Sequence, residues 1–383
     1  MSQPALPTFA PSSSASSALS GAGARRRRRR AALVGLAVVV GGLLSACGGD
    51  DADTKPAATG ASAPSTADTV PVNIGYFPNL THAPALIAEQ EGFFTKRIGE
   101  GKVKTQSFNA GPDVIQAIFG GSLDISYIGS NPTITAYAQS EGAGVRVIAG
   151  AASGGASLVV KPEIKGAADL KGKTLATPQL GNTQDVALRY WLKQNGLNTT
   201  TEGGGDVSIK PQKNSQGLQA FVSGQVDGAW VPEPFATQYV QKGAVRLIDE
   251  TSLWKDGKFV TTNVIVRTQF LKEHPETVRA FLEAHLDAIQ LAEKDPAKAQ
   301  SDVIAQIKKI TDQDTKPETV AEAWKFITFS ADPLTAALKE SANHADEVGL
   351  LEKKPSDGFA GLWDLAALNA ALKSRGLPEV SQS

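Results

Sequence analysis

The residues best suited to chemistry in this chain are small polar side chains and glycines gathered in three short loops. The loops read Phe77-Pro78-Asn79-Leu80-Thr81-His82, Gly129-Ser130-Asn131-Pro132 and Ser153-Gly154-Gly155-Ala156. Amide and hydroxyl groups donate neutral hydrogen bonds, and glycine lets the backbone approach a ligand closely. The loops therefore predict a polar binding site, with ordinary helix N-capping as the alternative role of Ser and Asn.

A fourth polar segment, residues 178–185, precedes a predicted helix. Its sequence PQLGNTQD has five polar side chains and one glycine among eight residues. Such a segment can hold a phosphate-like or sulfonate-like group, with Asn182 and Thr183 as donors, but it lacks the lysine and serine of a P-loop. Asp185 has a simpler alternative role, which is to cap the helix.

The segment GAWVPEPF, residues 228–235, leads from a strand into a turn stiffened by two prolines. Trp230 offers a rigid apolar wall with one N–H donor, and Phe77 offers a second wall for the organic part of a ligand. Glu233 has two interpretations: it faces the site and meets a ligand amine, or it is a hinge carboxylate. The alternative for the whole segment is a core tryptophan with Glu233 as a surface cap.

Catalytic, metal and nucleic-acid chemistry have no matching pattern in the sequence. His82 is the only histidine in a candidate loop, and neither a GxSxG nucleophile elbow nor HExxH spacing accompanies it. The single cysteine, Cys47, excludes an intrachain disulfide and a cysteine-based zinc site. The formal net charge is −1, and without the arginines at 25–30 the remainder carries about −7, which argues against nucleic-acid binding. We therefore expect no catalytic residue, no metal and no cofactor.

The N-terminus has the pattern of an export signal. Six arginines at 25–30 precede an apolar run at 31–44, about the length of a signal-peptide core and short for a membrane span. The run ends in Leu44-Ser45-Ala46-Cys47, which resembles a bacterial lipobox whose cysteine is lipidated. We expect residues 1–47 to be a signal peptide with a lipobox, and residues 48–71, rich in Ala, Ser, Thr, Asp and Pro, to be a flexible tether. An uncleaved anchor helix is the alternative, and the export route, Sec or Tat, stays open.

The elements that position these loops alternate between strand and helix. Predicted strands at 72–76, 103–108, 123–128 and 145–149 are separated by helices at 83–90, 113–119 and 130–138. A second series has strands at 157–160, 173–176, 207–210, 228–231 and 245–248, with helices at 185–194, 217–223 and 235–242. A strand at 259–266 leads back to the first series. Helices follow from residue 275 onward, and then at 298–310, 317–327, 333–348 and 363–374.

This order predicts an α/β fold with two lobes, each a largely parallel sheet with helices on both faces. Residues 72–157 and 259–383 form lobe 1, including a helical C-terminal region, and residues 158–258 form lobe 2. In open parallel sheets, ligands lie beyond the carboxyl ends of the strands, near helix N-termini that carry partial positive charge. We therefore expect the polar loops to meet in a ligand cleft between the lobes.

Four segments, in order, resemble one family. They are GYFPNLTHAPALIAEQEGFF at 75–94, FNAGPDVIQAIFGGSLDISYIGSNP at 108–132, ATPQLGNTQDVALRYWL at 176–192 and DGAWVPEPFA at 227–236. They are similar to the periplasmic-type binding proteins for nitrate, taurine and alkanesulfonates, over roughly residues 72–270. The resemblance implies a periplasmic-binding-protein type II fold that closes on a small ligand. It also implies an ABC permease with its ATPase as partners of what we expect to be a monomer, and the lipobox-like Cys47 implies an extracytoplasmic, lipid-anchored location. By position it implies ten cleft residues: Asn79, His82, Ser130, Asn131, Ser153, Gly154, Asn182, Thr183, Trp230 and Glu233.

The predicted ligand is a small organic oxyanion. The cleft loops contain no lysine or arginine apart from Arg189 inside its helix, whereas a nitrate or bicarbonate binder should bring a charged partner. Sulfonate is a weakly basic, diffuse anion that neutral donors can hold, so an alkanesulfonate is favoured, and Glu233 suits an amino-sulfonate such as taurine. The alternatives are nitrate or bicarbonate, a pyrimidine-type thiamine precursor, and a neutral or cationic solute held by Glu233. A related pyrimidine-synthesis enzyme requires a cysteine-rich motif, which the single cysteine disfavours.

Overall fold

The computed structural model describes residues 66–382. The predicted signal peptide, the lipobox Cys47 and most of the predicted tether lie outside the described residues. The end of that tether contacts the fold, because the backbone N–H of Val70 donates to Thr277 Oγ1 at 2.9 Å and Thr69 Oγ1 donates to the carbonyl of Ile98. Within residues 66–382, every helix is too short or too polar to cross a membrane.

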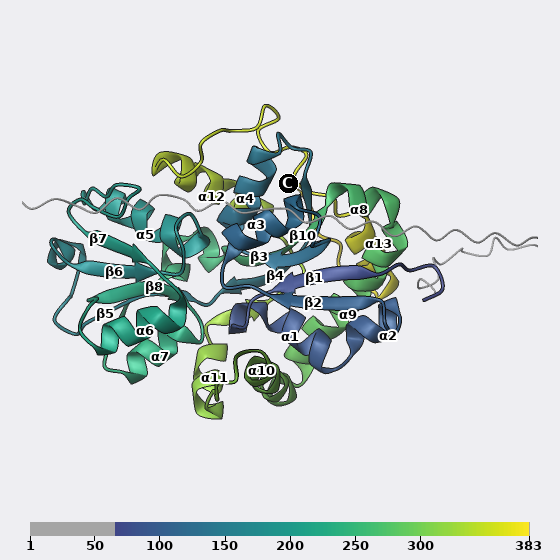
Figure 1. Cartoon of the computed structure of the whole chain (residues 1–383), viewed down its shortest axis with the longest axis horizontal. Helices are drawn as coiled ribbons and strands as arrows, with labels where there is room; N and C mark the ends of the chain where they lie inside the picture. The colour runs from purple at the N-terminus through teal and green to yellow at the C-terminus, as the bar shows by residue number, and fades with distance from the viewer. Residues whose placement is uncertain (1–65, 383) are drawn as a thin grey trace, which may run out of the picture. The chain divides into compact units, whose positions relative to one another are not determined.

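The first of two sheets has six strands in the order β11-β4-β10-β3-β1-β2 (Figure 1). Their bounds are β1 (Val72–Tyr76), β2 (Val103–Ser107), β3 (Ile125–Ile128), β4 (Val145–Gly154), β10 (Val260–Arg267) and β11 (Ile327–Phe329). β1 pairs in parallel with β2 and β3, but β10 is antiparallel to β3 and β4, and β11 is antiparallel to β4. The prediction of a largely parallel sheet is therefore wrong for this half. The chain enters β10 from the second sheet, whereas β4 leads toward that sheet, so β10 runs in the direction opposite to β3 and β4.

The second sheet has five strands in the order β7-β6-β8-β5-β9. Their bounds are β5 (Ala156–Val160), β6 (Thr174–Thr177), β7 (Ser208–Pro211), β8 (Gly228–Pro232) and β9 (Val245–Asp249). β6 is parallel to β7 and β8, whereas β5 is antiparallel to β8 and β9. This sheet is mixed for the same reason, since β5 arrives from the first sheet.

Helices cover both faces of each sheet. Figure 1 shows α1 (Ala83–Gln90), α2 (Phe93–Ile98) and α9 (Pro275–Lys294) on one side of the first sheet, and α3 (Gly111–Phe119) and α4 (Ser130–Gln139) on the other. On the second sheet, apolar residues of α5 (Thr183–Gln194) pack with Trp230 on one face. Residues of α6 (Asn214–Val222) and α7 (Phe235–Gln241) pack on the opposite face. We call the first sheet with its helices the first lobe, and the second sheet with α5, α6 and α7 the second lobe.

The C-terminal region adds α8 (Thr268–Glu273), α10 (Pro296–Thr311), α11 (Pro317–Trp324), α12 (Thr335–Glu347) and α13 (Ala366–Ser374). The apolar spacing predicted for α9 is confirmed, because Val278, Phe281, Leu282, His285, Ile289 and Ala292 are all buried. The helix predicted at 317–327 ends early, at Trp324. Ile327 and Phe329 are buried while Thr328 is exposed, a two-residue alternation that pairs this segment with the edge of β4 as β11.

The chain crosses between the sheets twice. The first crossing joins β4 to β5 through Gly155, and the second joins β9 to β10 through two 3-10 turns, η3 (Glu250–Leu253) and η4 (Lys255–Gly257). Gly154 and Gly155 have φ angles of +77° and +72°, which side chains rarely adopt. A Cβ on Gly154 would lie 2.5 Å from the carbonyl oxygen of Phe326. The first crossing therefore requires glycine for conformation and for space.

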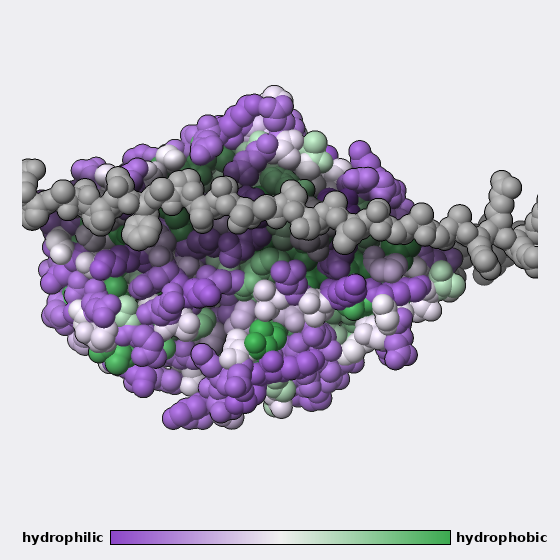
Figure 2. Space-filling model, in the orientation of Figure 1, coloured by the Kyte–Doolittle hydropathy of each residue, from purple (hydrophilic) through white to green (hydrophobic). Residues whose placement is uncertain are grey.

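The face of the molecule in Figure 2 is mostly hydrophilic, with small separate apolar areas. The large apolar side chains that are exposed come from different elements: Phe119, Leu180, Val222, Val240, Leu253 and Leu377. Single exposed apolar residues of this kind are ordinary for a water-facing surface and do not by themselves indicate a partner.

Candidate functional site

A small cavity of about 20 Å³ lies between the two lobes, where strands from both sheets end. The first lobe contributes segments that follow β1, β2 and β3 and one residue of β10, and the second lobe contributes segments that follow β6 and β7 and the last residue of β8. The lining side chains are all uncharged or neutral at ordinary pH: Phe77, Asn79, Thr81, His82, Asn109, Gly111, Gly129, Pro132, Pro178, Asn182, Thr183, Gln184, Asn214, Pro232 and Thr261. The cavity is therefore a polar site without a formal charge in its lining.

Four helices begin at this cavity. Gly111, Thr183 and Asn214 are the first residues of α3, α5 and α6, and Gly129 is the N-cap of α4. The first turn of a helix has backbone N–H groups without intrahelical partners and a partial positive charge. Two N-termini from each lobe thus direct donors and positive potential at one small space, which is a site for an anion.

His82 supplies a neutral donor. Its side chain is 2% exposed, and burial lowers its pKa to about 3. The backbone N–H of Phe77 donates to Nδ1 at 3.2 Å, so the neutral ring carries its proton on Nε2. The ring also packs against Phe77, with the ring centroids 4.2 Å apart. His82 can therefore donate one uncharged N–H to a ligand while Phe77 provides an apolar wall.

The start of α5 is held by its own side chains. Asn182 caps the helix, because its Oδ1 accepts from the backbone N–H of Asp185 at 3.0 Å. Asp185 does not cap; its carboxylate accepts from Thr177 Oγ1, from the backbone N–H of Gly181 and from Arg189 Nε at 2.9 Å. Arg189 is 2% exposed and Asp185 is 0% exposed, so this is a fully buried ion pair behind the cavity. Arg189 thus neutralises a carboxylate that would otherwise repel an anion.

Two buried oxygens at the cavity have no hydrogen-bond partner among residues 66–382. They are Thr183 Oγ1 and Asn214 Oδ1. Buried polar atoms are usually paired, because each unpaired one costs about 1–3 kcal/mol. A hydroxyl can rotate to donate, and the amide of Asn214 carries two N–H donors, so both side chains can turn donors toward a ligand.

The lobes contact each other around this cavity. The backbone N–H of Leu80 donates to the carbonyl of Glu233 at 3.1 Å, and Thr319 Oγ1 of α11 donates to Gln241 of α7 at 3.1 Å. Gly129 lies so close to α5 that a Cβ there would stand 2.3 Å from Thr183 Oγ1. The structure is therefore in a closed arrangement of the cleft.

The predicted site residues divide into those that meet in this cavity and those that do not. Phe77, Asn79, His82, Asn182 and Thr183 line it together. Ser130 and Asn131 instead line a second cavity of about 10 Å³ beside Thr183. There, Asn131 Nδ2 donates to the carbonyl of Ser341 in α12 at 3.0 Å.

Ser153 and Gly154 belong to β4 and not to a cleft loop. Ser153 is paired with Val260 and Thr328, and its Oγ accepts from the backbone N–H of Phe259 at 3.3 Å. Thr261 Oγ1 donates to the carbonyl of Gly154. β4 continues five residues beyond the predicted strand, and its polar groups are used at the crossing, so the two residues do not line the cavity. Their ligand contact stays a prediction.

Trp230 and Glu233 do not line the cleft cavity either. Trp230 is 0% exposed and packs with α5 in the core of the second lobe, where its Nε1 donates to Glu250 Oε2 at 2.7 Å. Glu233 is also 0% exposed; Oε1 accepts from Arg246 Nη2 at 2.7 Å and Oε2 from the backbone N–H of Thr237. Arg246 therefore balances the charge of Glu233 away from the cavity. The predicted ligand contacts of Trp230 and Glu233 stay predictions.

Several cavity residues were missed: Thr81, Asn109, Gln184, Asn214 and Thr261. Asn109 and Asn214 follow β2 and β7, so the rule applied to the other loops, a polar side chain just beyond a strand, would have found them. Thr261 could not be found in this way, because it lies on β10, a strand that reaches the cavity from the opposite direction.

Glu250, the partner of Trp230, is a buried acid with an unusual pKa. Burial raises the pKa to about 7, against the smaller lowering effect of hydrogen bonds from the indoles of Trp230 and Trp254. A folded state that holds this proton more tightly than the unfolded state loses stability as pH rises from about 4.5 to 7.

We therefore expect Glu250→Gln to remove this pH dependence. The free energy of unfolding of the variant minus that of the parent should be about 3 kcal/mol larger at pH 8 than at pH 4, because each pKa unit corresponds to about 1.4 kcal/mol. Urea denaturation of both proteins at the two pH values measures this difference. An unchanged difference between pH 4 and pH 8 would show that Glu250 titrates normally.

Known proteins resemble this chain in sequence and in fold. A profile of the NMT1-like family matches residues 65–308. The taurine-binding periplasmic protein of Escherichia coli (strain K12) is 28% identical over 250 residues, which is 64% of this chain and 74% of that protein. The alkanesulfonate-binding protein SsuA of Xanthomonas axonopodis pv. citri has the same fold, with a TM-score of 0.63 and 20% identity over 76% of this chain and 98% of that one.

A second protein with the same fold is the periplasmic nitrate-binding protein NrtA of Synechocystis PCC 6803. It has a TM-score of 0.68 and 18% identity over 83% of this chain and 91% of that one. These likenesses confirm the predicted α/β fold, two-lobed with a cleft and a helical C-terminal region, and the relatives are binding proteins and not enzymes. The matched profile covers well over half of the chain, and the protein belongs to the NMT1-like family.

Proposed function

We propose that this chain is the solute-binding protein of an ABC importer and captures a small oxyanion, with an alkanesulfonate as its ligand. The observation that carries the proposal is the convergence of four helix N-termini, two from each lobe, on a cavity with an uncharged lining. A ligand there contacts both lobes at once, and binding is therefore linked to closure of the cleft. The taurine-, alkanesulfonate- and nitrate-binding relatives support the same class of ligand.

The uncharged lining favours a sulfonate over a strongly basic anion. A sulfonate spreads one charge over three oxygens and needs several moderate donors rather than one counter-ion. Thr183, Asn214 and His82 supply such donors next to the helix N-termini. The apolar ring of Phe77 is the only aromatic wall among the lining residues, which suits a short alkyl tail.

Taurine is a weaker candidate than a plain alkanesulfonate. Its ammonium group requires a carboxylate, and the lining has none, since Glu233 is paired with Arg246. Nitrate is the second candidate, because in this closed arrangement the cavity of about 20 Å³ has room for about one water-sized centre, whereas an alkanesulfonate requires the lobes to lie further apart. Bicarbonate shares this size argument. A pyrimidine-type ligand has only Phe77 on which to stack.

The location and partners follow from the same proposal. Cys47 at the end of the predicted signal peptide is the proposed site of lipid attachment, and residues 48–71 are the proposed tether to the outer face of the cell membrane. The closed form delivers the ligand to a permease driven by an ATPase. We expect the chain to act as a monomer, with radius measurements by small-angle X-ray scattering as the test.

Thermal unfolding of the purified chain with a ligand panel tests the proposal. The panel holds ethanesulfonate, butanesulfonate, taurine, nitrate, bicarbonate, sulfate and an aminopyrimidine. A ligand at one hundred times its Kd stabilises the folded state by about 2.7 kcal/mol, which raises Tm by about 4 °C for a chain of this size. We expect the alkanesulfonates to raise Tm more than taurine. A rise with nitrate alone would replace the sulfonate by the second candidate, and a rise with the pyrimidine alone would overturn the oxyanion proposal.

A further inference from the structure

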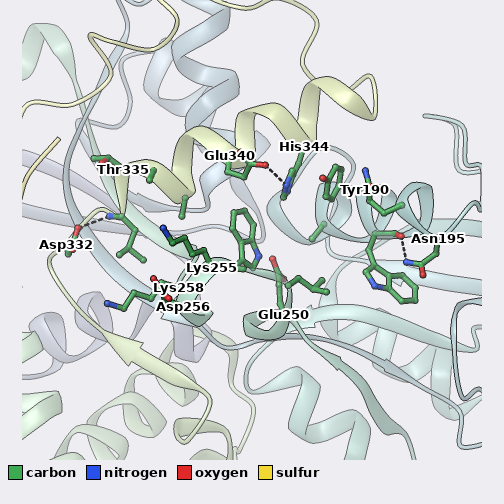
Figure 3. A pocket seen from close by; sticks show the side chains of 18 of the residues that line it. Tyr190, Asn195, Glu250, Lys255, Asp256, Lys258, Asp332, Thr335, Glu340 and His344 are labelled. Carbon is green, nitrogen blue, oxygen red and sulfur yellow. Dashed lines mark hydrogen bonds and ion pairs between the residues drawn. The ribbon is translucent and has the colours of Figure 1, made fainter. Parts of the chain in front are cut away.

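A much larger pocket, of about 890 Å³, shares no lining residue with the cleft cavity. We call it the aromatic pocket. It is bounded by α5 of the second lobe, by α12 of the first lobe and by the η3–η4 crossing. Figure 3 shows Glu340 and His344 of α12 on one side of the pocket and Glu250 on the opposite side. Its volume lies in the range of pockets that hold organic ligands.

One end of the pocket is aromatic. Tyr190 and His344 stack with their ring centroids 3.6 Å apart, and Trp254 lies 5.0 Å from His344. All three rings are partly exposed and line the pocket. Flat ligands gain dispersion energy and burial against such rings, and a cation near their faces gains a further electrostatic attraction.

The charge of the pocket is negative. Its lining includes the carboxylates of Glu250, Asp256, Asp332 and Glu340, and the two lysines Lys255 and Lys258. In Figure 3 both lysines lie with Asp256 and Asp332 at one end, away from Tyr190. The aromatic end therefore has Glu250 and Glu340 but neither of these lysines.

Glu250 is the least solvated of these acids. It is 1% exposed, its Oε2 accepts from Trp230 Nε1, and no lysine or arginine of residues 66–382 forms an ion pair with it. Glu233, the buried acid of comparable exposure, is paired with Arg246. Burying an ionised carboxylate without a cation is costly, and a bound cation removes that cost.

We propose that the aromatic pocket binds a flat aromatic amine, with its ammonium group paired with Glu250 and its ring against Trp254, Tyr190 and His344. The ammonium group supplies the cation that the protein does not. The ring occupies the space between α5 and α12. The cavity of about 10 Å³ beside Thr183 is also lined by Glu250, Trp254 and His344, so it lies between this pocket and the cleft cavity. The proposal does not depend on the identity of the cleft ligand.

Isothermal titration calorimetry of the full chain at pH 8 with tryptamine tests the proposal, with 3-ethylindole as the neutral ligand of nearly the same shape. We expect tryptamine to bind at least tenfold more tightly than 3-ethylindole. Glu250→Gln should abolish that ratio by weakening tryptamine alone. Trp254→Ala should weaken both ligands. Glu293→Gln, at an exposed position of α9, is the matched charge control and should leave both affinities unchanged.

Three results would overturn the proposal. The first is equal affinity for tryptamine and 3-ethylindole. The second is a ratio that survives Glu250→Gln; this variant should fold, because it removes a buried charge. The third concerns location: Asn214→Ala alters the cleft cavity only, and a tenfold change in tryptamine affinity in that variant would place the amine in the cleft. These titrations use no sulfonate, so they can be interpreted even if the proposed function is wrong.

Discussion

Thr183→Asp should abolish oxyanion binding while leaving the fold intact. Thr183 is the first residue of α5, lines the cleft cavity and has an unpaired Oγ1. A carboxylate in this position faces a bound anion at close range, where like charges about 4 Å apart repel by about 4 kcal/mol at an effective dielectric constant of 20. Calorimetric titration with the best ligand of the panel should show at least a 100-fold loss of affinity.

The same substitution should also lower stability, because Thr183 is 6% exposed and a buried carboxylate without a cation is unfavourable. The helix dipole offsets about 0.3–1 kcal/mol of that cost. Thr183→Val, which keeps the shape and removes the hydroxyl, should lose about tenfold in affinity. Ser215→Asp adds the same charge in the first turn of α6 at an exposed position and should retain binding. Full affinity in Thr183→Asp would mean that the anion does not lie at the start of α5.

Arg189→Met should cause the largest loss of stability of any single change near the cleft. The Asp185 carboxylate is 0% exposed, and Arg189 is its only cationic partner among the described residues. Removing one member of a buried ion pair leaves an uncompensated charge and costs about 3–5 kcal/mol. Urea denaturation should show this decrease. Anion affinity should also fall, since Asp185 would then act on the cavity unbalanced.

Two further variants separate the ion pair from the packing of the arginine side chain. Asp185→Asn combined with Arg189→Met should recover much of the lost stability, because neither charge remains. Lys325→Met removes one member of an exposed pair with Glu322 at 2.6 Å and should cost less than about 1 kcal/mol. If the double variant were as unstable as Arg189→Met alone, packing and the bonds of Arg189 to the 200–201 backbone would be the cause.

The sequence was informative wherever local pattern decides the structure. Asn79, His82, Asn182 and Thr183 each follow a strand, and strands that end at the same edge bring such residues together. The apolar spacing of α9 likewise depends only on neighbours along one helix.

Pairing between distant segments decided the rest. β8 is buried at all five positions, so no alternation indicates that Trp230 faces α5. The charge of Glu233 is balanced by Arg246, which lies on another strand, β9. β10 has the composition of any buried strand. Its antiparallel direction results from the path of the chain, which re-enters the first sheet from the second sheet. Such features depend on topology, which a local pattern does not contain.

The two crossings between the lobes have a mechanical consequence. They lie side by side, since Val260 at the start of β10 pairs with Ser153 next to Gly154. Two adjacent connections prevent the lobes from sliding apart or twisting independently and leave one rotation about the line that joins them. A rotation that parts α7 from α11 separates Gln241 from Thr319, and one that parts α5 from α12 separates Lys193 from Glu347. The angle between the lobes is therefore the one quantity by which a permease distinguishes the states of this protein, and the bound ligand sets the smallest value of that angle.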